Sequence, residues 1–282
     1  MICAWQSYLN ILPQWMRDAV DKHGKYTLQE TRLRVNMPPE LITQYGSVWL
    51  ERKVTTEDLS FSINVASKYS PWAAATIGNS YITAEGGHRI GICGEVVVSN
   101  HIVTGISVPS SLCIRVSRDY LGVAKSSMIQ NCSVLIIGPP GSGKTTLLRD
   151  LIRKASNEFA EHVVVVDEKG ELFPFINHVP CFQTGKMTDI ITGCPKKHGI
   201  EAAIRNMSPQ IIATDEITAS EDCQALLHAG WCGVKLFSTA HAGNKSDLFK
   251  RPIYRPILDT KLFDKLIVLK PDKTWTEERM NS

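Results

Sequence analysis

Short, continuously apolar runs alternate with helical periodicities through the second half of the chain. Four runs are rich in β-branched residues and are typical of strands buried on both faces of a parallel sheet: residues 133–137, 162–166, 210–214 and 234–239. Between them, apolar residues recur at helical spacing in three stretches: 147–152, 198–206 and 221–230. This alternation predicts a doubly wound α/β domain, which binds ligands at the carboxyl ends of its strands.

The first half of the chain has a different pattern. Residues 9–20 are helix-like, residues 31–35 are β-like, and residues 81–117 alternate apolar with polar positions and contain many glycines. The last stretch predicts antiparallel hairpins with turns at Glu85-Gly86-Gly87 and Ser99-Asn100. We therefore expect an α+β domain over residues 1–121 and an α/β domain over residues 122–282.

Composition and charge exclude several classes of protein. A hydrophobic content of 43% excludes a disordered chain, and a formal net charge of +3 is too small to indicate nucleic-acid binding. The longest uncharged stretch, residues 96–114, is interrupted by polar residues, and the N-terminus lacks the basic region of a signal peptide. The eight cysteines form no CxxC pairs, so we expect reduced thiols and a cytoplasmic protein.

One motif carries the chemistry of the α/β half. Residues 138–145, Gly-Pro-Pro-Gly-Ser-Gly-Lys-Thr, match the phosphate-binding pattern G-x-x-x-x-G-K-[ST] between an expected strand and an expected helix. Such a loop surrounds phosphates with backbone N–H groups, which Cβ atoms would obstruct, and the helix N-terminus adds a positive dipole. Lys144 would reach the β- and γ-phosphates, and Thr145 would bind Mg²⁺. The expected nucleotide-binding residues are Gly138, Pro139, Pro140, Gly141, Ser142, Gly143, Lys144, Thr145 and Thr146.

Acidic residues follow two of the other expected strands. Asp215 ends one strand, where it can supply the second Mg²⁺ ligand, and Glu216 can orient or deprotonate the attacking water. A cap on the next helix is the alternative for this pair. After the strand at 162–166, the cluster Asp167, Glu168 and Glu171 can complete the Mg²⁺ and water network or can form a solvated loop.

His241 follows the strand at 234–239, which we expect beside the P-loop strand. There its imidazole can sense the γ-phosphate, and the alternative is a histidine in a surface loop. Two short patterns favour GTP instead of ATP: D-x-x-G at 167–170 and N-K-x-D at 244–247. Only 29 positions separate Gly138 from Asp167, which leaves little room for a GTPase switch loop. ATP is therefore the preferred nucleotide, and GTP remains the alternative.

Taken together, these motifs resemble the type II/IV secretion ATPases and, over nearly the whole chain, the stage III sporulation AA family. The stretches that carry the resemblance lie in both halves: 30–34, 82–91, 111–116, 138–150, 193–196, 205–210, 214–217 and 238–241. The P-loop alone is unspecific, whereas the ordered set is specific. The resemblance implies a RecA-like motor domain behind a smaller α+β domain, with ATP and Mg²⁺ as cofactors.

The resemblance also implies partners and roles. It implies a homo-oligomer, most simply a hexamer, that serves membrane proteins of the sporulation channel between mother cell and forespore, peripheral to that complex. It assigns nucleotide-facing roles in one subunit and arginines that act from the neighbouring subunit's N-terminal domain. The residues are Glu168 or Glu171, Glu216 and His241 at the nucleotide, Arg115 and Arg118 with Arg89 behind them from the neighbour, and Arg205 ahead of the acidic strand.

The chain departs from the family pattern at three places. Lys169-Gly170 replaces Arg-Ser, Lys186-Met187 replaces Arg-Thr, and Thr218-Ala219 replaces Gly-Arg. Because lysine does not reproduce the bidentate contacts of arginine, these changes favour slower turnover. Two other functions therefore stay open: an assembly scaffold gated by nucleotide, and a nucleic-acid motor, which the near-neutral charge disfavours.

Overall fold

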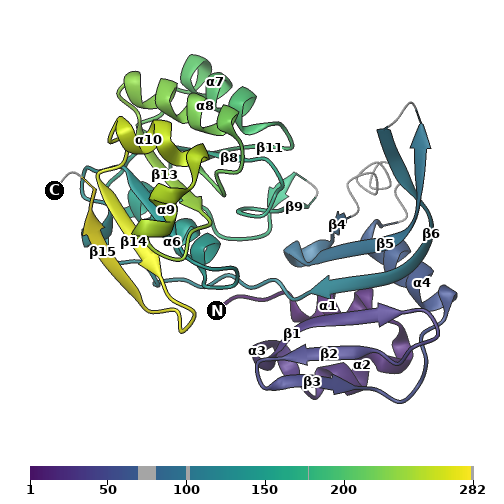
Figure 1. The fold of residues 1–282 in the computed structure, drawn as a ribbon. Helices are drawn as coiled ribbons and strands as arrows, with labels where there is room; N and C mark the ends of the chain where they lie inside the picture. Colours follow the sequence, from purple (N-terminus) through teal and green to yellow (C-terminus); the bar gives the residue numbers. More distant parts are fainter. Residues whose placement is uncertain (69–80, 100–101, 177, 281–282) are drawn as a thin grey trace. The chain divides into compact units, whose positions relative to one another are not determined.

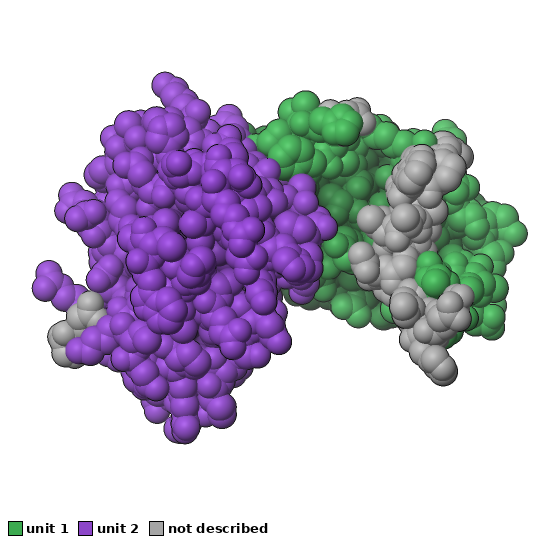
Figure 2. Space-filling view, turned by 90° about the horizontal axis from the view of Figure 1, so that it is seen from above, with its two compact units in different colours: residues 1–119, 174–182 green, residues 120–173, 183–282 purple. Residues whose placement is uncertain are grey.

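The computed structural model describes residues 1–68, 81–99, 102–176 and 178–280, which cluster into two compact units. Unit 1 comprises residues 1–119 and 174–182, and unit 2 comprises residues 120–173 and 183–282 (Figure 2). A single boundary after residue 121 would leave residues 174–182 in the α/β half, whereas contacts group them with unit 1. The division into independently folding domains over residues 1–121 and 122–282 stays a prediction.

Unit 1 is built on one antiparallel sheet with the strand order β3-β2-β1-β6-β5-β4. The predicted hairpins over 81–117 are confirmed, and the turn at 85–87 is a short 3₁₀ segment, η2 (Glu85–Gly87). The other predicted turn includes Asn100, which lies outside the described residues. The strands are β1 (Leu28–Arg34), β2 (Glu40–Thr43), β3 (Gly46–Trp49), β4 (Tyr81–Thr83), β5 (Arg89–Ser99) and β6 (Ile102–Arg115).

In the described part of unit 1, four helices accompany this sheet: α1 (Trp5–Ile11), α2 (Gln14–Asp21), α3 (Gly24–Thr27) and α4 (Thr56–Ala66) (Figure 1). The helix-like stretch at residues 9–20 is confirmed as parts of two helices, α1 and α2, with a break at Leu12 and Pro13. Leu12 is extended because the residue before a proline is driven out of the helical region, and Pro13 starts the second helix. Apolar residues of α1, α2 and α4 pack with residues of β1, β5 and β6 in one core.

A short hairpin from the second half of the chain joins unit 1. Strands β9 (Phe175–Ile176) and β10 (Val179–Pro180) pair with each other and pack beside η2. Gly87 has a φ of +77°, and a Cβ at this position would lie 3.1 Å from Pro174 and 3.2 Å from Phe182. Glycine is therefore required here both by the backbone conformation and by the close approach of the hairpin.

Unit 2 contains a seven-stranded sheet with the order β11-β8-β12-β13-β7-β14-β15. All neighbouring pairs are parallel except β14 with β15. The four predicted strands are confirmed as β7 (Val134–Ile137), β8 (Val163–Asp167), β12 (Ile211–Thr214) and β13 (Lys235–Ala240). The sequence patterns did not predict β11 (Thr188–Thr192), β14 (Lys265–Leu269) or β15 (Trp275–Arg279).

Helices cover both faces of this sheet. Helix α6 (Lys144–Glu158) packs on one face, and α7 (Lys196–Asn206), α8 (Ser220–Trp231) and α10 (Arg255–Asp259) share a core with the other face, as Figure 1 shows. Short helical segments η3 (Ser126–Met128), α9 (Lys245–Lys250) and η4 (Pro252–Tyr254) complete the unit. Because β13 lies between β7 and β12, the carboxyl ends of β7, β13, β12 and β8 are neighbours at one edge.

Candidate nucleotide-binding site

The loop between β7 and α6 has the shape that phosphate binding requires. A Cβ on Gly138 would lie 2.8 Å from the carbonyl oxygen of Leu269 and 2.7 Å from Ser142 Oγ, so only glycine fits. Gly141 and Gly143 have φ angles of +74° and +98°, in the left-handed region that favours glycine. These glycines keep the loop free of Cβ atoms where its backbone turns into the helix.

Two features of the loop fit a bound phosphate. No side chain caps α6 at Gly143, which leaves the first amides of the helix available to an anion. Ser142 Oγ is buried and has no hydrogen-bond partner among the described residues. A buried hydroxyl without a partner is costly, and a phosphate oxygen would satisfy it.

Lys144 folds back over its own loop. Its Nζ donates hydrogen bonds to the carbonyl oxygens of Gly138 at 2.9 Å and Pro139 at 3.0 Å, and lies 3.3 Å from His241 Nδ1. Burial lowers the pKa of Lys144, and the nearby carboxylates of Asp215 and Glu216 oppose that shift. The ammonium group is thus held at the loop by weak neutral acceptors that phosphate oxygens can replace.

Asp215, at the end of β12, ties the P-loop helix to two strands. Thr145 Oγ1 donates to Asp215 Oδ2 at 3.0 Å, and Thr239 Oγ1, from β13, donates to Asp215 Oδ1 at 2.6 Å. The backbone N–H of Glu216 donates to Asp215 Oδ1 at 3.0 Å and to Thr239 Oγ1 at 2.8 Å. The hydroxyl of Thr145 and the carboxylate of Asp215 therefore meet at one point, as a shared Mg²⁺ would require.

This donor set fits Mg²⁺. Mg²⁺ in nucleotide sites takes one or two protein oxygens and fills its octahedron with phosphate oxygens and waters. Thr145 and Asp215 supply those protein oxygens, and among the described residues no group of three or more His, Cys, Asp or Glu forms a separate metal site.

Glu216 and His241 form a pair at the tips of β12 and β13. His241 Nε2 lies 3.1 Å from Glu216 Oε1, and both side chains are about one-third exposed, at 34% and 39%. Glu216 has a φ of +33°, an unusual backbone conformation for a residue with a side chain. Strain of this kind persists where the surroundings impose it and is common at functional sites.

Asp167 organises the loop that follows β8. Its carboxylate accepts backbone hydrogen bonds from Glu171, Leu172 and Phe173, each at 2.9 Å, and is almost fully buried. Burial raises the pKa of Asp167 to about 6, with a smaller contribution from the charge of Asp215, and the amide hydrogen bonds oppose the rise. The acidic loop is thus a fixed structure rather than a freely solvated one.

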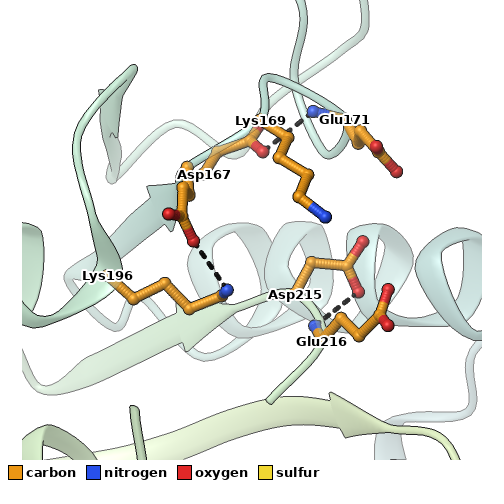
Figure 3. Close-up of a pocket in the computed structure, with 7 residues that line it drawn as sticks. Asp167, Lys169, Glu171, Lys196, Asp215 and Glu216 are labelled. Atoms are coloured by element: carbon orange, nitrogen blue, oxygen red, sulfur yellow. Dashed lines mark hydrogen bonds and ion pairs between the residues drawn. The ribbon is translucent and has the colours of Figure 1, made fainter. Parts of the chain in front are cut away.

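The remaining charged residues line a cleft beside Asp215 and Glu216 (Figure 3). Glu168 pairs with the buried Lys196 at 2.8 Å, and Lys196 also lies 3.6 Å from Asp222. Lys169 and Glu171 extend into the same cleft from the loop above it. The two cations that line the cleft are lysines.

The structure brings together the predicted site residues of the strand ends and the P-loop, and it does not bring Arg205 to them. Lys144, Thr145, Asp215, Glu216 and His241 are linked by direct contacts. By contrast, Arg205 is exposed in the last turn of α7, which precedes β12 and therefore lies at the amino ends of the strands, opposite the P-loop.

The N-terminal arginines lie in unit 1. Arg115 is 64% exposed and lies 3.5 Å from Glu30, so its side chain is accessible. Arg118 is half-buried and its guanidinium donates to the backbone oxygens of Lys25, at 2.7 Å, and Leu28. Arg89 lies over the ring of Tyr81, 4.2 Å from its centroid. Of these three arginines, Arg115 is the most exposed. It is therefore the best candidate to reach the nucleotide of a neighbouring subunit.

Sequence reasoning missed two residues of the site, Thr239 and Lys196, and the structure gives the N-K-x-D pattern a role other than nucleotide binding. Thr239 was recognisable from its place at the end of a strand beside the P-loop strand, whereas Lys196 gave no signal before the fold placed it next to Glu168. The N-K-x-D pattern has a structural role, because Asn244 caps α9 by accepting from the Asp247 N–H at 2.8 Å. The Asp247 carboxylate is itself bound by the Gly243 N–H.

A strand–P-loop–helix unit, an acidic strand end separated from it by one intervening strand and a largely parallel sheet define a P-loop protein with a RecA-like core. The chain belongs to the family described as sporulation stage III, protein AA, whose sequence profile matches residues 6–279. It is 36% identical over 272 residues to "Stage III sporulation protein AA" of Bacillus subtilis (strain 168), across 92% of this chain and 89% of that protein.

Solved structures of an ATPase and of a pilus retraction motor share the fold. The ATPase DotB of Legionella pneumophila matches with a TM-score of 0.58 at 15% identity, over 95% of this chain and 81% of that one. The pilus retraction motor PilT with bound ADP matches with a TM-score of 0.60 at 13% identity, over 89% and 76%. Among the described residues, no helix has the length and apolarity needed to cross a membrane.

Proposed function

We propose that this member of the family binds ATP with Mg²⁺ and hydrolyses it as a motor. The observation that carries the proposal is the contact network that joins Lys144, Thr145, Asp215, Glu216 and His241 at the carboxyl ends of three adjacent strands. Lysine at the phosphates, a hydroxyl and a carboxylate for Mg²⁺, and a second carboxylate for water are the parts that phosphoryl transfer to water uses.

Each residue has a distinct task in this proposal. Lys144 would exchange its contacts with the loop carbonyls for the β- and γ-phosphates. Thr145 and Asp215 would hold Mg²⁺, which would supply positive charge at the phosphate oxygens. Glu216 accepts the proton of the attacking water as a general base. His241 bridges Lys144 and Glu216, so its imidazole couples the phosphate end of the site to the base.

We further propose that hydrolysis takes place at subunit boundaries of a ring, most simply a hexamer. Charge that develops on the γ-phosphoryl group needs a guanidinium, which is worth about 10³–10⁵ in rate when it is supplied. The cleft of unit 2 is lined by Lys169 and Lys196, so the proposal assigns this role to a neighbouring subunit's Arg115 or Arg118. Glu168 and Glu171 would line the nucleotide side of the cleft, whereas Arg205 takes no part in this proposal because it lies at the opposite ends of the strands.

A nucleotide-gated scaffold with little turnover is the second candidate. The observation that favours it is the lysine pair in the cleft, because a lysine gives a phosphate one point charge where an arginine gives two parallel hydrogen bonds. In either case we propose a cytoplasmic protein that works at membrane proteins of a sporulation channel complex, with no nucleic-acid partner.

Specific activity measured against protein concentration tests the motor proposal. The full chain is assayed for phosphate release from Mg·ATP over a wide concentration range, and its mass in solution is followed at the same concentrations. Activity per subunit is expected to rise steeply as rings form, because each site is completed by a neighbour. Full activity of a strictly monomeric protein would contradict the ring, and an assembly that needs nucleotide but never hydrolyses it would favour the scaffold.

A further inference from the structure

A second pocket of unit 2, separate from the acidic cleft, lies against the P-loop. It has a volume of about 220 Å³ and shares no lining residue with the cleft. Because a water molecule occupies about 30 Å³ of the liquid, this pocket has room for an organic group. Backbone of Gly141–Gly143 forms one wall, and the side chains around it include Tyr120, Val123, Thr146, Leu269, Lys273 and Trp275.

The lining suits a planar heterocycle. Val123 and Leu269 are apolar, Tyr120 and Trp275 are aromatic, and Lys273 supplies one cation. Small-molecule sites in proteins have this composition, with apolar and aromatic walls and a few polar groups. Lys125 Nζ lies 5.7 Å from the centroid of the Trp275 ring and helps to hold the ring in place.

The β14–β15 hairpin forms a rigid wall of the pocket, and its turn contains one residue in a strained backbone conformation, Lys273. Leu269 pairs with Trp275, and the turn between them is closed by Lys270 N–H donating to Thr274 O at 2.8 Å. Asp272 accepts from Thr274 at 2.9 Å and 2.6 Å. Lys273 has a φ of +67° at a turn position that favours Gly or Asn, and its side chain lines the pocket.

The opposite wall is fixed to the P-loop helix. Asp150 of α6 accepts from the backbone N–H groups of Gly122, at 3.2 Å, and Ala124, at 2.7 Å. Arg153, which pairs with Asp150 at 3.1 Å, donates to the backbone oxygen of Tyr120 at 2.8 Å. These hydrogen bonds fix segment 120–124 to α6, the helix that begins at the phosphate-binding loop. The pocket is therefore preformed.

We infer that this pocket binds the purine base of the nucleotide, with Trp275 as the stacking surface. The inference rests on the proposed function, because it requires a nucleotide whose phosphates lie on the P-loop. Gly141–Gly143 of the phosphate loop and Thr146 of the helix that follows it line this pocket, so a nucleotide whose phosphates lie on the loop has its base within reach of the pocket. Sequence motifs gave no sign of the role, since Trp275 lies 130 positions after Thr145 on an unpredicted strand.

Calorimetric titrations of the full chain with Mg·ATP and with Mg·tripolyphosphate test the inference. Tripolyphosphate carries the phosphate chain without a base, so only the binding of ATP should depend on the Trp275 ring. Trp275→Ala is expected to weaken the binding of Mg·ATP roughly ten- to a hundredfold, which is the range of base–aromatic stacking. The affinity for Mg·tripolyphosphate should stay unchanged. Trp275→Phe should retain most of the affinity. Trp231→Ala, which removes a tryptophan that is 74% exposed on α8 of the same unit, is the matched control.

The outcomes separate this inference from the proposed function. If the unsubstituted chain binds neither ligand, the nucleotide site itself is wrong. If it binds both and Trp275→Ala changes neither, the base lies elsewhere and the inference is overturned while the phosphate site stands. If Trp275→Ala weakens both ligands equally, Trp275 supports the P-loop and does not read the base, which also overturns the inference.

Discussion

Thr145 Oγ1 donates a 3.0 Å hydrogen bond to Asp215 Oδ2, although the two residues are 70 positions apart. Thr145 lies in the first turn of the helix after the P-loop, and Asp215 directly follows a strand two places away from the P-loop strand in the sheet. Their contact places a hydroxyl and a carboxylate on the same side of the phosphate cradle. It is the geometric reason for expecting Mg²⁺ to bind together with the nucleotide.

Thr145→Val should remove the benefit of Mg²⁺ for nucleotide binding. Valine keeps the shape of threonine but loses the hydroxyl, so ATP affinity in the presence of Mg²⁺ should fall roughly tenfold or more, about 1.4 kcal/mol. Thr145→Ser keeps the hydroxyl and is the matched control. Calorimetry with and without Mg²⁺ measures the effect, and an unchanged Mg²⁺ dependence in Thr145→Val would remove Thr145 from the metal site.

Glu216→Gln should separate binding from hydrolysis. Glutamine preserves the shape of the side chain next to His241 but cannot accept the proton of water, so turnover should fall roughly 10²–10⁴-fold. ATP affinity should stay close to that of the unsubstituted chain. Phosphate release and equilibrium binding are measured on the same preparation, and undiminished turnover would assign the base to another residue.

Gly87→Ala should destabilise unit 1 and loosen the β9–β10 hairpin. A Cβ there would crowd Pro174 and Phe182 at 3.1 Å and 3.2 Å, and the left-handed φ adds about 1 kcal/mol or more of strain. Gly91→Ala is the matched control, because its Cβ would meet only ordinary contacts at 3.9 Å. Thermal unfolding and protease cleavage within residues 174–182 measure both variants. Equal behaviour of the two would show that the close approach at Gly87 is unimportant.

Acidification should destabilise unit 1 through His88. This side chain is fully buried. Its Nε2 is hydrogen-bonded to the backbone oxygen of Ala4 at 2.9 Å, and its Nδ1 accepts a hydrogen bond from the backbone N–H of Ser117 at 3.0 Å. Burial lowers the pKa of His88 to about 4, with a smaller lowering by Arg118, and the hydrogen bond to Ala4 opposes the shift. Since the unfolded chain has a histidine pKa near 6.5, it binds the proton first, and stability falls as the pH drops from about 6.5 toward 4.

The expected loss between pH 7.5 and pH 5 is about 2 kcal/mol. Hydrogen exchange at the amides of β1 and β6 follows the free energy of opening of unit 1 across this range. His88→Gln removes the titrating group and should flatten the pH dependence, although it starts from a lower stability. The same slope in both proteins would exclude His88 as its source.

The sequence predicted the α/β unit well because its strands and its P-loop are each marked by a short contiguous stretch of residues. A fully buried strand such as β8 reads as a continuous apolar run, and the P-loop is a contiguous stretch whose glycines are explained by the turn itself. The same logic placed Asp215 and His241 at adjacent strand ends, since parallel neighbours end at the same edge. The sequence also placed the strand before His241 beside the P-loop strand, and the structure adds that this strand, β13, separates β7 from β12.

The features that pattern missed depend on distant segments. β11 has partly buried and exposed residues and none that is fully buried, so it lacks the apolar run that marked the other strands. Lys196 gains its role from Glu168 and Asp222, which the fold brings to it from two other elements. The hairpin at 174–182 joins unit 1 through a glycine almost ninety positions earlier. Contacts of this kind leave no periodicity in a single sequence.

The central claim is that a nucleoside triphosphate is held where β7 meets α6, and calorimetric binding of Mg·ATP to the full chain and to Lys144→Ala tests it most directly. The matched control is Lys154→Ala, which removes a lysine of the same helix that pairs with Glu158 at 2.6 Å. The account predicts saturable binding to the unsubstituted chain and to Lys154→Ala, and a loss of about a hundredfold or more in Lys144→Ala. No binding to the unsubstituted chain, or equal affinity in all three proteins, would contradict it.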